Sequence, residues 1–155
     1  MTIYTSVCCF LLALISWSCR QDFDRHLLVQ TYWQLDTIRT DPQLIDGPGA
    51  MHMMEACEKD DSWQFSSNGL LRIYRGENHC RPDENFTDIL GGWNISRQGD
   101  RLSIREAGGF TTTYEIRTLS REQLILHYTA DEAEIILTYK SISARLLAGK
   151  DRSGE

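Results

Sequence analysis

The most concentrated group of chemically capable side chains is the stretch ACEKDDSWQF at positions 56–65, which joins a cysteine to four charged residues and two aromatic ones. Its adjacent carboxylates, Asp60 and Asp61, would suit general acid–base catalysis only if both faced one substrate. Neighbouring residues of a strand point to opposite faces, so we interpret the two aspartates as a solvated turn that leads into a strand. The sequence also contains no Gly-x-Ser-x-Gly motif and no glycine-rich phosphate loop. We therefore predict a protein that is not an enzyme and needs no cofactor.

Two groups of residues contain ligands that metals prefer. The run MHMM, Met51–Met54, offers soft thioethers suited to Cu(I) with His52 between them, although the same residues also suit a flexible apolar cover. Cys57 and Cys80, together with His52 and His79, contain the donors of a mixed zinc site, but their spacing matches none of the familiar structural patterns. We expect no metal site here.

The N-terminus has the composition of a targeting segment. No Lys, Arg, Asp or Glu occurs among residues 1–18, and the apolar run from Val7 to Trp17 is much shorter than the roughly 20 residues that span a bilayer as a helix. Ser18 followed by Cys19 resembles the lipobox of bacterial lipoproteins, in which the cysteine is lipidated. We expect a signal peptide over 1–18, a lipidated tether and short helical turn over 19–30, and attachment to the outer membrane of the cell envelope, on its periplasmic or surface face. Ordinary secretion with a free Cys19 is the alternative.

The remaining cysteines then form a simple set. Cys8 and Cys9 leave with the signal peptide and Cys19 takes the lipid, so Cys57 and Cys80 are left in an exported domain. Two cysteines in an oxidising compartment are most economically a disulfide, which we predict between these two residues.

The mature chain alternates between apolar and polar residues with a period of two, the pattern of strands that are buried on one face. A length of 155 residues fits one domain, and a formal net charge of -6 argues against a nucleic-acid partner. We expect a folded domain over 31–142 and a flexible tail over 143–155. The regular short spacing of the strands is typical of an all-β barrel or sandwich. Eight strands are predicted, at residues 32–38, 62–66, 70–75, 92–97, 101–106, 110–118, 123–129 and 134–142.

Several motifs resemble a known family. They are LLVQTYW at the first strand, the cysteine before KDDSWQFSSNG, the second cysteine after RGENHC, the GGW strand and the closing LTY strand. Together, over residues 27–142, they look like the lipocalin-like lipoproteins of Bacteroidetes. The resemblance implies an eight-stranded antiparallel up-and-down β-barrel with a short N-terminal helical lead-in.

A barrel of this size has an interior that is either filled by side chains or holds one small ligand. Tentative ligand-binding residues are Trp33, Trp63, Phe65, Trp93 and Tyr114, although large aromatic side chains also serve as ordinary core. We expect a lipid-anchored barrel that binds a small apolar ligand. The alternatives are a protein-binding module, such as an inhibitor or a component of a surface complex, and a structural lipoprotein with a filled core. The full set of residues expected to point inward is Trp33, Leu35, Trp63, Phe65, Trp93, Ile95, Leu102, Ile104, Tyr114, Ile116, Leu124 and Leu126.

Overall fold

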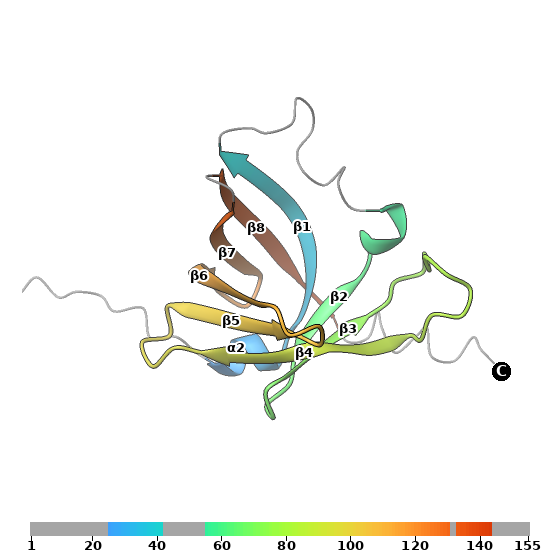
Figure 1. The fold of residues 1–155 in the computed structure, drawn as a ribbon, viewed down its shortest axis with the longest axis horizontal. Helices are drawn as coiled ribbons and strands as arrows, with labels where there is room; N and C mark the ends of the chain where they lie inside the picture. The colour runs from blue at the N-terminus through green and yellow to red at the C-terminus, as the bar shows by residue number, and fades with distance from the viewer. Residues whose placement is uncertain (1–24, 42–54, 131–132, 144–155) are drawn as a thin grey trace, which may run out of the picture.

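Eight antiparallel strands close into a single barrel in the computed structural model, which describes residues 25–41, 55–130 and 133–143. Each strand pairs with the next along the chain, and β8 pairs with β1 to close the barrel (Figure 1). The predicted all-β up-and-down architecture is therefore confirmed. The strands are β1 (Tyr32–Asp41), β2 (Ser62–Phe65), β3 (Leu70–Tyr74), β4 (Thr87–Ile95), β5 (Arg101–Glu106), β6 (Thr111–Leu119), β7 (Gln123–Ala130) and β8 (Ala133–Ile142).

The signal segment 1–18, the lipidation candidate Cys19 and the methionine run Met51–Met54 lie outside the described residues. Most of the expected C-terminal tail, from residue 144 onward, lies outside them as well. Within the part of the chain that is described, no helix has the length and apolar character needed to cross a membrane.

Strand β4 is longer than its sequence pattern indicated. It begins at Thr87, whereas alternation predicted a start at residue 92, because TDILGG does not alternate regularly. The pairing of β3 with β4 shifts register between Leu71 and Arg72. Opposite this shift, Gly91 lies so close to β5 that a Cβ would collide with the Arg105 carbonyl group. The strand therefore continues through a bulge that only glycine permits, and the bulge interrupts the two-residue period.

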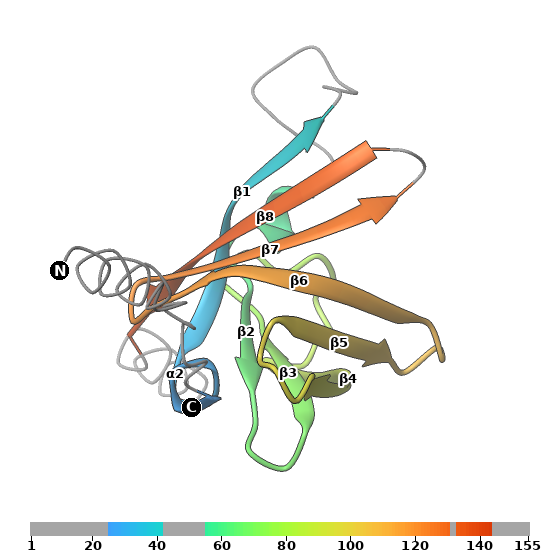
Figure 2. The same ribbon diagram turned by 90° about the vertical axis from the view of Figure 1, so that its left-hand side faces the viewer.

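A short helix covers one end of the barrel, as the sequence predicted. Helix α2 (Arg25–Val29) lies beside the start of β1 (Figure 2), and its Leu28 is completely buried. The indole Nε1–H of Trp33 donates a hydrogen bond to the Leu28 carbonyl oxygen at 3.1 Å. The Arg25 guanidinium lies 5.1 Å from the centre of the Trp93 ring, a cation–π contact. These contacts close this end, which we call the closed end.

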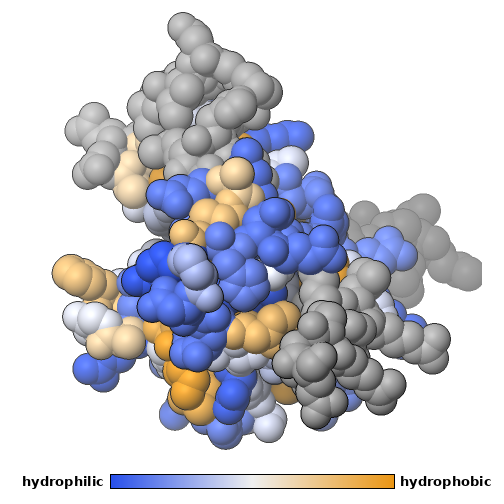
Figure 3. All heavy atoms as spheres, turned by 90° about the vertical axis from the view of Figure 1, so that its right-hand side faces the viewer, coloured by the Kyte–Doolittle hydropathy of each residue, from blue (hydrophilic) through white to orange (hydrophobic). Residues whose placement is uncertain are grey.

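The opposite end carries the longer connections. The 3-10 turn η3 (Ala56–Glu58) precedes β2 there, and residues 75–86 join β3 to β4 (Figure 1). The predicted disulfide between Cys57 and Cys80 is confirmed and links these two segments, with Cα atoms 5.2 Å apart. We call this end the mouth. Seen from the side on which these segments lie, the described surface is mostly hydrophilic with a few hydrophobic groups (Figure 3).

The core lies inside the barrel and continues under helix α2. All the residues predicted to point inward belong to it, either buried or packed against buried residues. Sequence reasoning missed several other members, among them Leu28, Leu71, Leu137 and Tyr139.

Candidate functional site

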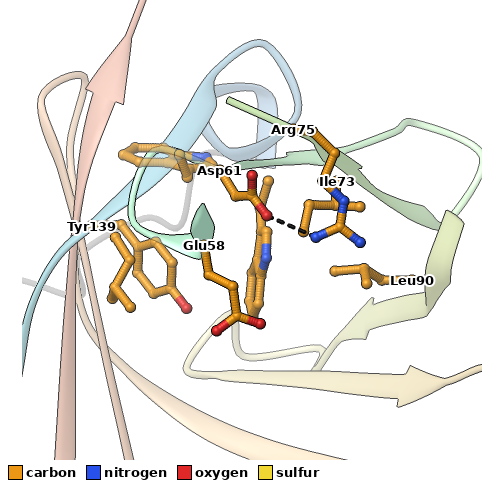
Figure 4. A pocket seen from close by; sticks show the side chains of 9 residues that line it. Glu58, Asp61, Ile73, Arg75, Leu90 and Tyr139 are labelled. Atoms are coloured by element: carbon orange, nitrogen blue, oxygen red, sulfur yellow. Dashed lines mark hydrogen bonds and ion pairs between the residues drawn. The ribbon is translucent and has the colours of Figure 1, made fainter. Parts of the chain in front are cut away.

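The barrel interior is not completely filled. A cavity of about 310 Å³ lies between the mouth and the packed closed end (Figure 4). Its walls come from η3, from the lead-in to β2, and from strands β1, β2, β3, β4 and β8. The residues that line it are Trp33, Leu35, Glu58, Asp61, Trp63, Ile73, Arg75, Leu90 and Tyr139.

A second cavity of about 420 Å³ lies on the other side of Trp63 and Leu90, which line both spaces. It is bordered by β3, β4, β5, β6 and the turn that follows β5. Its lining comprises Trp63, Leu71, Ile89, Leu90, Ile104, Glu106, Ala107, Gly108 and Tyr114. One aromatic and one aliphatic side chain therefore separate two small, mainly apolar spaces.

The three regularly spaced tryptophans have different surroundings. Trp33 is fully buried and donates its indole N–H to helix α2. Trp93 donates its N–H to the Ser66 carbonyl oxygen at 3.1 Å and packs edge-on against Phe65, with ring centroids 5.4 Å apart. Trp63 is only partly buried and lines both cavities. Thus Trp93 and Phe65 form the packed base of the barrel at the closed end. Trp33 borders the first cavity on the side of the closed end, and Trp63 forms part of the wall of both cavities.

The mouth contains a buried ion pair. Asp61 is 8% exposed and accepts a hydrogen bond from Arg75 Nη1 at 2.8 Å and another from the Gly76 backbone N–H at 3.0 Å. Burial raises the pKa of the Asp61 carboxyl above its usual value, with a smaller contribution from nearby Asp60, while the contacts with Gly76 and Arg75 oppose the rise. The expectation that both aspartates are solvated is therefore wrong for Asp61. Arg75 is 14 residues away in sequence but adjacent in the fold, and it supplies the charge that makes the burial of Asp61 tolerable.

The neighbouring Asp60 also contacts the segment that joins β3 to β4. One of its carboxylate oxygens accepts hydrogen bonds from the backbone N–H groups of Glu77 and Asn78, at 2.6 and 3.3 Å. Gly76 is required at this point, because a Cβ there would collide with the Asp60 carboxylate. Asp60 and Asp61 thus fasten the β3–β4 connection to the lead-in of β2. Both Asp61 oxygens and Asp60 Oδ2 make structural contacts, whereas Asp60 Oδ1 is buried without a hydrogen-bond partner among the described residues.

Three tyrosines face the interior on adjacent strands. The rings of Tyr114 and Tyr128 meet edge to face with centroids 5.1 Å apart. Burial, reinforced by Tyr128, raises the pKa of Tyr114 to about 12, and burial also raises the pKa of Tyr139 well above its usual range. Within the described residues the Tyr139 hydroxyl has no hydrogen-bond partner, although its side chain lines the first cavity. It is a neutral polar group that a bound molecule can use.

Glu58 is the remaining charged residue of the first cavity. Its carboxylate Oε2 accepts a hydrogen bond from the Glu55 backbone N–H at 3.2 Å, which fixes the 3-10 turn. Its neighbour Cys57 forms the disulfide. No basic side chain pairs with Glu58 among residues 25–41, 55–130 and 133–143.

The structure changes the set of candidate site residues. Of the predicted ligand-binding residues, Trp33 and Trp63 line the first cavity and Tyr114 the second, whereas Phe65 and Trp93 line neither. Sequence reasoning missed the cavity residues Glu58, Asp61, Ile73, Arg75, Leu90 and Tyr139. Alternation in LTY placed Leu137 and Tyr139 on one face and was the available signal for Tyr139.

The zinc alternative is wrong for the cysteines. Glu55, Cys57 and Cys80 bring donor atoms within 4.8 Å of one another, but both sulfur atoms belong to the disulfide and offer no thiolate. His52, the upstream histidine of that alternative, lies outside the described residues.

The comparison with protein families agrees with the architecture. Residues 29–126 match the family model described as a lipocalin-like domain. Among solved structures, an uncharacterised protein from Bacteroides eggerthii is similar at 13% sequence identity and a TM-score of 0.41, over 72% of this chain and 97% of that one. No curated protein matches the chain in sequence.

Proposed function

Since the chain belongs to the lipocalin-like domain family, we propose that it is a binding protein that holds one small, mainly apolar molecule inside the barrel. The observation that carries this proposal is the 310 Å³ cavity between the packed base and the mouth. Small-molecule sites are typically concave and apolar with a few polar groups, and this cavity combines both features. Asp60 and Asp61 serve structural contacts, which favours binding over catalysis.

The cavity sets the size of the ligand. At about 30 Å³ for each non-hydrogen atom, the volume that liquid water occupies per molecule, 310 Å³ admits roughly ten such atoms. A single aromatic ring with a short side chain is therefore a better fit than a fatty acid or a sterol.

We further propose that a lipid on Cys19 attaches the protein to the outer membrane of the cell envelope. Support comes from the uncharged apolar segment and the Ser18–Cys19 pair. From Cys19 to the start of helix α2 at Arg25 the chain can extend at most about 20 Å. Such an anchor would hold the closed end toward the bilayer and leave the mouth facing the aqueous phase. The ligand would then be taken from solution.

Isothermal titration calorimetry with 2-phenylethanol tests the binding proposal, because this probe matches the cavity in size. The wild-type protein should bind it with one-to-one stoichiometry. Leu90→Trp fills the space that Leu90 borders and should abolish binding. Phe110→Trp places the same side chain at a position that is 76% exposed, outside both cavities, and should leave affinity unchanged. Equal affinity in wild type and Leu90→Trp would overturn the proposal.

Intact mass spectrometry of the membrane-extracted protein tests the anchor. Loss of residues 1–18 and addition of acyl chains at Cys19 is the expected result. A soluble, unacylated mature chain would contradict it.

A further inference from the structure

The first cavity carries an uncompensated negative charge. Three charged side chains line it. Two are the carboxylates of Glu58 and Asp61, and the third is the guanidinium of Arg75. Asp61 pairs with Arg75 at 2.8 Å, and Asp88 lies 3.9 Å from the same guanidinium. Glu58 is therefore left as the cavity carboxylate without a basic partner in the described part of the chain. Two carboxylates against one guanidinium give the lining one net negative charge.

The Glu58 carboxylate is held in place before any ligand arrives. The hydrogen bond from Glu55 N–H and the disulfide at Cys57 fix the turn on which Glu58 lies. Figure 4 shows the Glu58 side chain extending into the space that the Tyr139 ring borders. A preorganised charge of this kind binds its counterion without a large ordering cost.

Two aromatic walls beside Glu58 also attract positive charge. The rings of Trp63 and Tyr139 lie 5.3 Å apart at 36°, and both line the cavity. Aromatic faces carry partial negative charge and stabilise a cation within about 6 Å. The unpartnered Tyr139 hydroxyl oxygen can in addition accept a hydrogen bond from an ammonium group.

We propose that the cavity binds a small organic amine in its protonated form. The apolar body of the amine would lie among Trp33, Ile73 and Leu90, with the ammonium group against Glu58 and the faces of Trp63 and Tyr139. This inference rests on the proposed function, because it identifies the ligand class of the same cavity. An anionic head group is disfavoured, because the Arg75 guanidinium already pairs with Asp61 and has Asp88 3.9 Å away, so two carboxylates would repel a second anion there. Its Nε is a buried donor without a hydrogen-bond partner in the described part of the chain, and it is a group on Arg75 that a neutral acceptor on a ligand could use.

Three probes of nearly equal size and different charge test the inference by calorimetry at pH 7. They are 2-phenylethylamine, which is a cation, 2-phenylethanol, which is neutral, and phenylacetate, which is an anion. The amine should bind about tenfold more tightly than the alcohol, as expected for one charge-assisted contact with a cation–π contribution, and phenylacetate should bind least. Raising the salt concentration should weaken binding of the amine more than binding of the alcohol.

Glu58→Gln removes the charge and retains an oxygen that can accept the Glu55 N–H, so the turn should persist. In this variant the amine should lose its advantage while the affinity for the alcohol stays the same. Glu122→Gln is the matched control, because it removes the same charge from the exposed β6–β7 connection at the closed end. It should change neither affinity.

The outcomes separate the two proposals. If the alcohol binds and the amine binds no more tightly, the inference about amines is overturned while the binding function stands. If an amine preference exists and survives Glu58→Gln, the assignment of Glu58 is overturned. If neither the alcohol nor the amine binds, both proposals fail.

Discussion

The disulfide between Cys57 and Cys80 should contribute a large share of the stability of the barrel. The bond spans 23 residues and encloses the whole β2–β3 hairpin, whose strands pair from Ser62 with Tyr74 to Phe65 with Leu71. In the chain-entropy model, closing a loop of this length removes about 11 cal/mol/K from the unfolded chain, or about 3.4 kcal/mol at 25 °C. Small domains are stable by about 5–15 kcal/mol, so this single bond represents a quarter or more of the total.

The perturbation is the double variant Cys57→Ser/Cys80→Ser, which leaves no unpaired thiol. Equilibrium unfolding in urea, followed by tryptophan fluorescence, should show a loss of about 3 kcal/mol and a larger dependence on urea, because the unfolded chain without the cross-link exposes more surface. The native mouth should persist in this variant. Asp60 and Asp61 still fasten the β3–β4 connection through Glu77 and Gly76.

Wild-type protein treated with a thiol reductant is the control and should unfold at the same urea concentration as the double variant. Coincident unfolding curves for oxidised wild type and the double variant would refute the loop-closure reasoning. A variant that no longer folds at all would show that the disulfide holds the native mouth together, rather than acting mainly on the unfolded chain.

Three further predictions concern the mouth, the interior and the closed end. Gly76→Ala forces a methyl group onto the Asp60 carboxylate and should destabilise the protein by about 1–3 kcal/mol in urea unfolding, whereas Gly108→Ala, whose methyl group would meet Phe110 at 3.7 Å, should be neutral. The folded-state pKa of Tyr114, about 12, lies above the unfolded value, so stability is retained below pH 10 and falls by up to about 3 kcal/mol as the pH rises from 10 to 12. Tyr114→Phe should flatten that decline, and an unchanged slope would contradict the assignment. Leu28→Ala should cost about 2–5 kcal/mol in the same unfolding assay, and a loss below about 0.5 kcal/mol would mean that helix α2 does not contribute to the core.

Strand alternation predicted the barrel well because each strand buries one face. Trp33, Trp93 and Leu124 all lie on the inner face where the period of two placed them. The pattern failed at the start of β4, where Gly91 allows a bulge and a close approach to β5. A bulge adds a residue on one strand only, so the alternation loses its register and no longer indicates where the strand begins.

The mouth could not be predicted in the same way, because its contacts join segments that are distant in sequence. Asp61 is buried since Arg75 lies opposite it, and that proximity depends on the β2–β3 pairing. The letters KDD alone indicate a solvated turn, which is the commoner environment for adjacent charges. Only the pairing of β2 with β3 places a guanidinium and three backbone N–H groups around these carboxylates.

The tryptophans show which part of the site local sequence determines. Trp33, Trp63 and Trp93 share one pattern, a tryptophan, an amide and then an apolar residue, and all three belong to the core or pack against it. That pattern indicates the face of the strand, but it contains no information about position along the barrel axis. Axial position follows from the register between strands and from what covers each end. Because helix α2 lies at the closed end, Trp33 turns its N–H to that helix, while its cross-strand partner Trp63 borders the open space. The same local pattern therefore produces one tryptophan that is completely buried beside helix α2 and one that stays half-buried, although both line the first cavity.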